Sequence, residues 1–318
     1  MPADMLKPPL IPDIPLEVRE AASQGKLVIF VGAGVSRLLK GPDWDGLANG
    51  ALKQLTEHGC IDFAELEQMK SLDPKTRLSI VMDICDATNT KLDFRSILQP
   101  ELEDWLGIYQ DLYAIGSVFV TTNYDEWLDS YAEQFLPTSA SQIPEAQSGG
   151  PQSRPPRQVI WKRADLTVEK LSKLGTVIHL HGSVKEPESM VITTKQYLEH
   201  YLDEGVDTFL RELFARYTVL FIGYGLAEQE ILEYAFRKIE AQHYWLFPIF
   251  SYQDKLLKHL TEYYQNHCNV RLISFRRDEH DWNQLVGVVS EWANQLKSIV
   301  REPDYLEKIN LIDEVGDE

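Results

Sequence analysis

Residues 26–34 read KLVIFVGAG, a short apolar run that ends in two glycines. Continuous apolar runs of this length are typical of strands buried on both faces of a parallel sheet. Five further runs of the same kind occupy residues 117–122, 176–182, 217–225, 244–250 and 270–275. Amphipathic helical stretches lie between several of them. This alternation predicts an α/β fold built on a doubly wound parallel sheet.

Three segments depart from the alternation. Residues 45–116 contain helical patterns but no convincing strand, which predicts a helical insertion. Residues 137–158 are rich in Pro, Ser, Gly and Gln and have too few apolar side chains to order themselves, which predicts a mobile loop. The acidic tail at 301–318 is expected to be frayed or bound to a partner. Otherwise, residues 1–318 are expected to form a single domain.

The composition excludes several classes of protein. The 318 residues are 44% hydrophobic, and 49 acidic residues outnumber 31 basic ones to give a net charge of −18. A surface of that sign repels phosphate backbones, so direct nucleic-acid binding is not expected. No apolar run reaches the roughly 18 residues of a membrane span, and the N-terminus lacks a signal-peptide pattern. Three widely spaced cysteines favour a reducing compartment, so we expect a cytoplasmic protein.

The first strand runs directly into a Gly-x-Gly turn. Such a turn allows close backbone approach and presents N–H groups at the start of a helix, as the diphosphate of a dinucleotide requires in Rossmann-like folds. The third glycine of the usual GxGxxG pattern is replaced by Arg37. The signal is therefore weak by itself, because many strand–helix turns use glycine only to turn. The candidate cofactor-binding residues here are Gly32, Ala33, Gly34 and Ser36.

A second glycine turn follows the fourth run, in FIGYG at 221–225. Gly223 and Gly225 are expected to supply the other half of a dinucleotide crevice.

The stretch VFVTTNYDEW, residues 118–127, carries an amide and a carboxylate to the end of a buried strand. One interpretation makes Asn123 or Asp125 the N-cap of the helix that follows. The other makes the pair part of an active site at the edge of the sheet. The stretch does not decide between them.

The stretch TVIHLHGS, residues 176–183, carries two histidines. Because side chains alternate along a strand, His179 and His181 are expected to share a face. Gly182 ends the strand, so His181 should lie at the carboxyl edge of the sheet, where ligands bind in open α/β folds, whereas His179 is expected to be a buried, structural imidazole. His-x-His is also a metal-ligand spacing, but no further ligand cluster lies nearby, so no metal site is predicted.

Together these strand ends resemble one family. GAGVS with GPDW at 41–44, then TTNYD, HLHGS and FIGYG, are similar in order and placement to the motifs of the sirtuin superfamily, over about residues 25–250. The resemblance is closest to a bacterial branch that acts in anti-phage defence. Asp43 and Trp44 stand where the family has Asp-Phe-Arg, and the expected arginine has no clear match.

The resemblance implies that NAD is the substrate and that Asn123 and His181, as catalytic residues, flank the nicotinamide ribose. An amide both donates and accepts hydrogen bonds without adding charge, so it suits a water molecule or a ribose hydroxyl. Histidine suits a general base because its ordinary pKa is near 6.5. Asp125 would hold the ribose or cap the helix, and both roles remain open.

One departure from the family bears on the reaction. Deacetylase sirtuins carry a four-cysteine zinc ribbon after the histidine motif, but residues 183–201 contain no cysteine, so no zinc ribbon is expected. Without a bound acyl-lysine, water is the natural nucleophile, which favours an NAD+ hydrolase that releases ADP-ribose and nicotinamide. A protein deacylase or ADP-ribosyltransferase, and a non-catalytic NAD- or ADP-ribose-binding module, remain as alternatives. The defence branch implies a homo-oligomer and a partner protein that carries the sensor, of the HerA-like ATPase or short Argonaute type.

Overall fold

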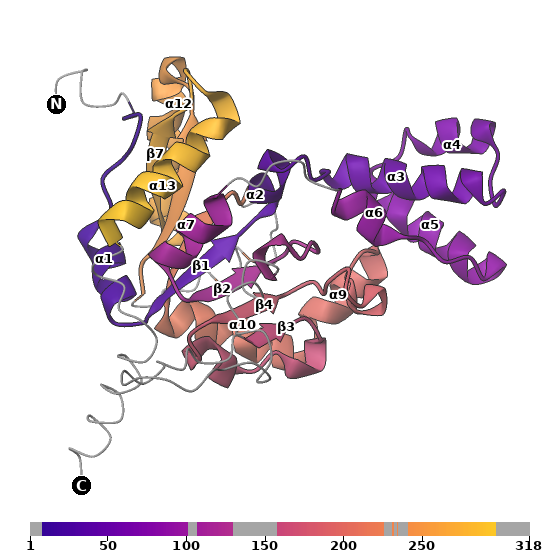
Figure 1. Cartoon of the computed structure of the whole chain (residues 1–318), viewed down its shortest axis with the longest axis horizontal. Helices are drawn as coiled ribbons and strands as arrows, with labels where there is room; N and C mark the ends of the chain where they lie inside the picture. The colour runs from indigo at the N-terminus through magenta and orange to yellow at the C-terminus, as the bar shows by residue number, and fades with distance from the viewer. Residues whose placement is uncertain are drawn as a thin grey trace, which may run out of the picture.

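The computed structural model describes residues 8–100, 107–129, 158–225, 231, 234 and 241–296. Within them, seven strands form one sheet in the order β3-β4-β2-β1-β5-β6-β7, and every neighbouring pair is parallel (Figure 1). The predicted α/β class with a doubly wound parallel sheet is confirmed. The strands are β1 Leu27–Val31, β2 Val118–Thr121, β3 Gln158–Ile160, β4 Thr176–His179, β5 Thr218–Ile222, β6 His243–Ile249 and β7 Val270–Arg276.

Strand β1 explains why its sequence is a continuous apolar run. All five of its residues are buried. Ile29 and Val31 join the hydrophobic cluster on one face of the sheet, whereas Val28 and Phe30 join the cluster on the other. Because side chains alternate along a strand, a strand with helices on both sides needs apolar residues at every position.

One strand was not predicted. β3 pairs with the outer side of β4 at the edge of the sheet. It has only three residues, and of these only Ile160 is buried, so its sequence QVI forms no apolar run. Gln158, the last residue of the expected loop at 137–158, begins this strand. The rest of that segment and the tail at 301–318 lie outside the described residues.

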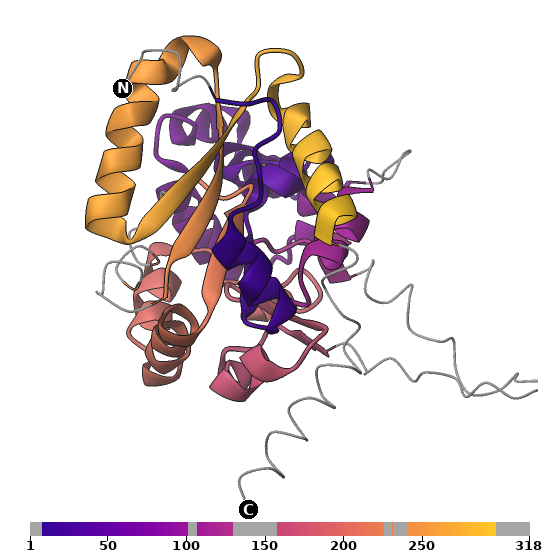
Figure 2. The same ribbon diagram turned by 90° about the vertical axis from the view of Figure 1, so that its left-hand side faces the viewer.

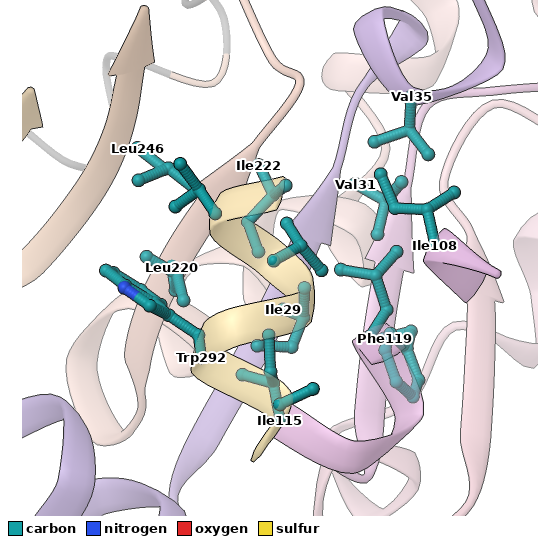
Figure 3. Close-up of a cluster of buried hydrophobic side chains, with 14 of the residues drawn as sticks. Ile29, Val31, Val35, Ile108, Ile115, Phe119, Leu220, Ile222, Leu246 and Trp292 are labelled. Carbon is teal, nitrogen blue, oxygen red and sulfur yellow. The ribbon is translucent and has the colours of Figure 1, made fainter. Parts of the chain in front are cut away.

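Helices cover both faces of the sheet. One face carries α1 Leu16–Ser23, α7 Ile108–Ile115 and α13 Gln284–Leu296, and the other carries α10 Glu204–Arg216 and α12 Asp254–Cys268. Figure 2 shows α12, in orange, and α13, in yellow, on opposite sides of β6 and β7. On the first face, Trp292 of α13 and Ile115 of α7 pack over Ile29 and Leu220 of the central strands (Figure 3).

The helical insertion forms a separate cluster. Its helices are α3 Trp44–Glu57, α4 Phe63–Met69, α5 Pro74–Thr88 and α6 Phe94–Leu98, and they lie beside the sheet (Figure 1). Each begins at an aspartate whose carboxylate accepts a backbone N–H, the usual N-cap interaction: Asp43, Asp62, Asp73 and Asp93. α7 lies within the segment 45–116 but packs on the sheet, so the clustered part of the insertion ends at Leu98.

The remaining elements are short. They are α2 Ala33–Leu38, α9 Thr194–Tyr201, and the 3-10 turns η2 Arg163–Asp165, η3 Val168–Ser172, η4 Pro187–Ser189, η5 Ser251–Gln253 and η6 Asp281–Asn283. None of the described helices is both long and apolar enough to cross a membrane.

Candidate active site

The strand order places a topological switch point at the carboxyl edge of the sheet. β1 and β5 are neighbours in the sheet. From β1 the chain continues to β2, toward the edge formed by β3, whereas from β5 it continues to β6, toward the edge formed by β7. Adjacent strands whose connections leave in opposite directions define a topological switch point, where open α/β folds bind ligands. Both glycine turns lie at this point, and Asn123 and Asp125 follow the neighbouring strand β2.

The two glycine turns pack directly against each other. The Gly32 N–H donates to the Ile222 carbonyl at 2.9 Å, and the Gly34 N–H donates to the Gly223 carbonyl at 2.7 Å. A Cβ atom at Gly32 would lie 2.4 Å from the Cα of Tyr224, and one at Gly34 would lie 2.6 Å from the Gly223 oxygen. Packing alone therefore requires glycine at both positions, and their N–H groups are engaged within the protein.

The glycines after β5 differ from each other. Gly223 has a φ of +63°, in the left-handed region, and a Cβ there would lie 2.7 Å from the Val35 nitrogen. Gly225 is exposed, and a Cβ there would meet no atom within 4 Å. The backbone conformation and close packing thus explain why position 223 is glycine, but packing among the described residues does not explain the glycine at position 225.

A hydrogen-bond network joins the first turn to the end of β2. The Asn123 side-chain amide donates to Ser36 Oγ at 2.9 Å, and Ser36 Oγ donates to Asp125 Oδ2 at 2.7 Å. Ser36 and Asp125 are buried, whereas Asn123 is half-buried. The fold therefore brings Ser36 together with two predicted site residues that lie 87 and 89 positions further along the chain.

The two carboxylate oxygens of Asp125 have different partners. Its Oδ1 accepts the Trp127 backbone N–H at 3.3 Å, in the manner of a cap, while its Oδ2 belongs to the network with Ser36. Burial raises the pKa of Asp125 to about 6, although the Ser36 hydrogen bond and the charge of His179 act in the opposite direction.

His181 lies under helix α9 and has no exposed surface. Its Nε2 is 2.7 Å from the Tyr201 hydroxyl and its Nδ1 is 3.3 Å from the Tyr197 hydroxyl. Burial, with smaller effects from His200 and Lys75, holds the pKa of His181 well below its ordinary value. The imidazole is therefore neutral near pH 7, the form that a general base requires.

The strand alternation behind the expected shared face of His179 and His181 is not present. β4 ends at His179, so the alternation of a strand does not extend to His181. The His179 ring instead lies between the Asn123 carbonyl, 2.8 Å from Nδ1, and the Asp129 carboxylate, 2.9 Å from Nε2. The two rings have no hydrogen-bond partner in common.

Hydrogen bonds of the Tyr124 main chain and side chain tie the Asn123 and His181 loops together. Its carbonyl accepts the Val184 N–H at 2.9 Å, and its hydroxyl donates to the Val191 carbonyl at 2.6 Å. The Val191 N–H in turn donates to the His181 carbonyl at 2.8 Å. The aromatic residue between Asn123 and Asp125 thus fixes one loop against the other.

The insertion also reaches the site. Lys75 Nζ lies 4.0 Å from the centre of the Tyr197 ring, and Trp44 packs against Tyr124 and Tyr197 with ring centres 6.2 and 6.1 Å away. Asp43, next to Trp44, caps α3 and lies 3.8 Å from the guanidinium of Arg37.

Sequence reasoning missed several of these residues. Tyr197 and Tyr201 lie on α9 and Lys75 lies on α5, and Asp129 follows the motif TTNYD within a helical stretch. No sequence signal marked their proximity to the two histidines. Among residues 8–100, 107–129, 158–225 and 241–296, no group of three or more His, Cys, Asp or Glu side chains is placed to hold a metal ion.

Comparison with known proteins supports the family resemblance. Residues 117–273, which include β2 to β6 and most of β7, match the family model described as SIR2-like domain. The chain is also 23% identical over 233 residues to Defense-associated sirtuin 2 of Bacillus subtilis, an alignment that covers 68% of this chain and 19% of that protein. The chain therefore spans about a fifth of the length of this relative. The predicted resemblance to the sirtuin superfamily and to its defence branch is confirmed.

Proposed function

We propose that this protein is an NAD+ hydrolase that cleaves the bond between nicotinamide and ribose to give ADP-ribose and nicotinamide. The observation that carries the proposal is the Ser36–Asn123–Asp125 network at the switch point of the sheet. It places an amide, a hydroxyl and a carboxylate beside two glycine turns, next to a loop that carries a neutral histidine.

Each group has a role that its chemistry suits. The nicotinamide of NAD+ is a cationic leaving group, so the enzyme has mainly to stabilise an oxocarbenium-like ribose and to position a nucleophile. Asn123 is half-buried and is held through Ser36, so its amide can orient a water molecule or a ribose hydroxyl. Asp125 has a pKa of about 6, so it is largely ionised at pH 7 and supplies negative charge.

The glycine turns and the first residues of α2 are proposed to bind the dinucleotide. The engaged amides of Gly32 and Gly34 fix the shape of this surface. Ala33, Ser36, Gly223 and Gly225 complete the proposed surface.

His181 is the proposed general base. Both of its nitrogens contact tyrosine hydroxyls of α9, so a substrate hydroxyl or water must replace one of these contacts before the base can act. Tyr197 and Tyr201 therefore belong to the proposed site as residues that hold the neutral ring until substrate arrives.

The absence of cysteine from residues 183–201 supports water as the nucleophile. The same segment forms η4 and α9, and two tyrosine hydroxyls of α9 contact the His181 ring. We propose that the reaction needs neither a peptide co-substrate nor a metal ion.

The test is product analysis. Purified protein is incubated with NAD+, with and without an acetyl-lysine peptide and in the presence of EDTA, and the products are separated by HPLC. We expect ADP-ribose and nicotinamide in equal amounts with no peptide present. Acetyl-ADP-ribose formed only with peptide would make the protein a deacylase, and binding of NAD+ without turnover would make it a binding module.

We further propose a role in anti-phage defence, because the curated relative is named as defence-associated. Uncontrolled loss of NAD+ would be toxic, so we propose a homo-oligomer and a partner protein that carries the sensor, of the HerA-like ATPase or short Argonaute type. Co-purification of this chain with the product of a neighbouring gene is the measurement that checks this.

A further inference from the structure

His179 connects the end of β4 to the loop that carries Asn123. In the sheet it is paired with Thr121, the last residue of β2. Its Nδ1 lies 2.8 Å from the main-chain carbonyl of Asn123, and its Nε2 lies 2.9 Å from Asp129 Oδ1. His179 and Asp129 are each 1% exposed, so both interactions are shielded from water.

The partners determine the protonation of the ring. A carbonyl oxygen only accepts hydrogen bonds, so Nδ1 must carry a proton, and an ionised carboxylate likewise requires a proton on Nε2. Burial lowers the pKa of His179, but the charge and hydrogen bond of Asp129, with the Asn123 carbonyl, raise it to about 9. His179 is thus an imidazolium at neutral pH, paired with the Asp129 carboxylate.

Two other ionisable groups face this pair. Asp125, on the same loop as Asn123, adds negative charge near His179. Tyr109 of α7 lies close to both aspartates, and burial together with their charges raises its pKa well above 10. Neither group removes the positive charge of the ring near pH 7.

Stability alone does not explain a buried ion pair. Replacing such a pair by apolar residues of similar volume is often neutral or stabilising, because the pair loses its hydration. Here Asp129 Oδ2 has no hydrogen-bond partner among the described residues, which adds to that cost. The pair has instead a geometric consequence: a charged donor fixes the peptide plane after Asn123, in a segment outside the strands and helices.

We propose that Asp129 and His179 form a positioning pair for Asn123. The imidazolium holds the Asn123 carbonyl, so the side-chain amide is aimed at Ser36. Asp129 acts through His179. The geometric part of this inference stands independently of the proposed NAD+ hydrolysis, whereas its effect on turnover rests on that function.

The first experiment measures the pKa of His179 in the full chain by NMR of ¹⁵N-labelled histidine. We expect a pKa well above 6.5 in the wild type and a fall of at least one unit in Asp129→Asn, a change that nearly conserves volume. A wild-type pKa at or below 6.5, or an unchanged value in Asp129→Asn, overturns the proposal. This readout needs no substrate and no activity.

The second experiment follows the side-chain amide signals of Asn123 in His179→Phe, which keeps a ring but removes the donor. The matched control is His243→Phe, since His243 is also 1% exposed, starts strand β6 and accepts a hydrogen bond from Val219. We expect both variants to lose stability but only His179→Phe to shift the Asn123 signals. Unmoved Asn123 signals in folded His179→Phe overturn the proposal, as do equal shifts in the two variants.

The third experiment applies if the wild type cleaves NAD+. Asp129→Asn is then expected to lower kcat about tenfold or more while leaving KM within about threefold, because Asn123 is misaligned for the reaction. An unchanged kcat in Asp129→Asn would show that the positioning pair does not affect turnover. Absence of cleavage by the wild type would defeat the proposed function and leave the NMR results to decide the positioning pair.

Discussion

Nε2 of His181 lies 2.7 Å from the hydroxyl oxygen of Tyr201, and the ring has no exposed surface. The proposed base is therefore held neutral and covered by α9. His181→Gln keeps a hydrogen-bonding side chain beneath the tyrosines but cannot take up a proton. We expect NAD+ cleavage to fall about 10²–10⁴-fold, the usual loss for a general base, with the fold retained. Exposed His259, on α12, gives the control His259→Gln. Near-wild-type turnover in a folded His181→Gln protein would remove His181 from the mechanism.

Asn123→Ala tests the amide of the network. The variant loses the side chain that donates to Ser36, but its main-chain carbonyl remains available to His179. We expect a loss of activity of about 10²-fold or more with little change in melting temperature. Asn283→Ala, at an exposed position in η6, is the control and should behave as the wild type. A large drop in melting temperature with turnover per folded molecule unchanged would show that Asn123 is structural.

Asp125→Asn tests the raised pKa of the buried Asp125 carboxyl group, through the pH dependence of the free energy of unfolding. The pKa of Asp125 is higher in the folded protein, about 6, than its ordinary value of 3.8, so the folded state binds the proton more tightly. Its contribution to stability is therefore greatest below about pH 3.8 and is lost as pH rises through about 6. An uncharged amide has no such loss, so the unfolding free energy of Asp125→Asn relative to wild type should rise between pH 4 and pH 7.

The expected rise is at most about 3 kcal/mol, since one pKa unit corresponds to about 1.4 kcal/mol. Urea unfolding at several pH values measures it. Asp83→Asn, at an exposed position on α5, is the control and should show a smaller change. A relative stability of Asp125→Asn that is flat or falls with pH would contradict the raised pKa.

Gly34→Ala and Gly225→Ala distinguish a glycine that the packing of the two turns requires from a glycine proposed to line the NAD+ surface. An alanine Cβ at position 34 would lie 2.6 Å from the Gly223 oxygen, so the two turns must move apart, at a cost of about 1–3 kcal/mol. A Cβ at position 225 meets nothing within 4 Å, so that variant should melt at the wild-type temperature. Thermal unfolding measures both changes. Equal melting temperatures for the two variants would contradict the packing of the turns.

Gly225→Ala also has a functional readout. If this glycine lines the nucleotide surface, its variant should weaken NAD+ binding, measured by calorimetry, without loss of stability. Unchanged affinity would leave Gly225 outside the site.

The sequence alone determined the fold class and located the strand ends that carry the candidate site residues. A strand covered on both faces must be apolar at every position, so runs such as 26–34 mark the central strands directly. The carboxyl ends of parallel strands meet at one edge, so the groups after β1, β2 and β5 were expected to meet there. Edge strand β3 was not predicted, because it is short and only partly buried and its sequence therefore forms no apolar run.

The tertiary structure alone decided what surrounds each site residue. His179 and His181 are two positions apart, yet one ring meets Asp129 and the other meets Tyr201, because β4 ends between them. These partners lie 50 and 20 residues away from the histidines in the chain. Local periodicity reports which face of an element is buried, but not which distant side chain fills that face. The charge of His179 and the neutrality of His181 depend on those distant neighbours, so only the folded chain fixes them.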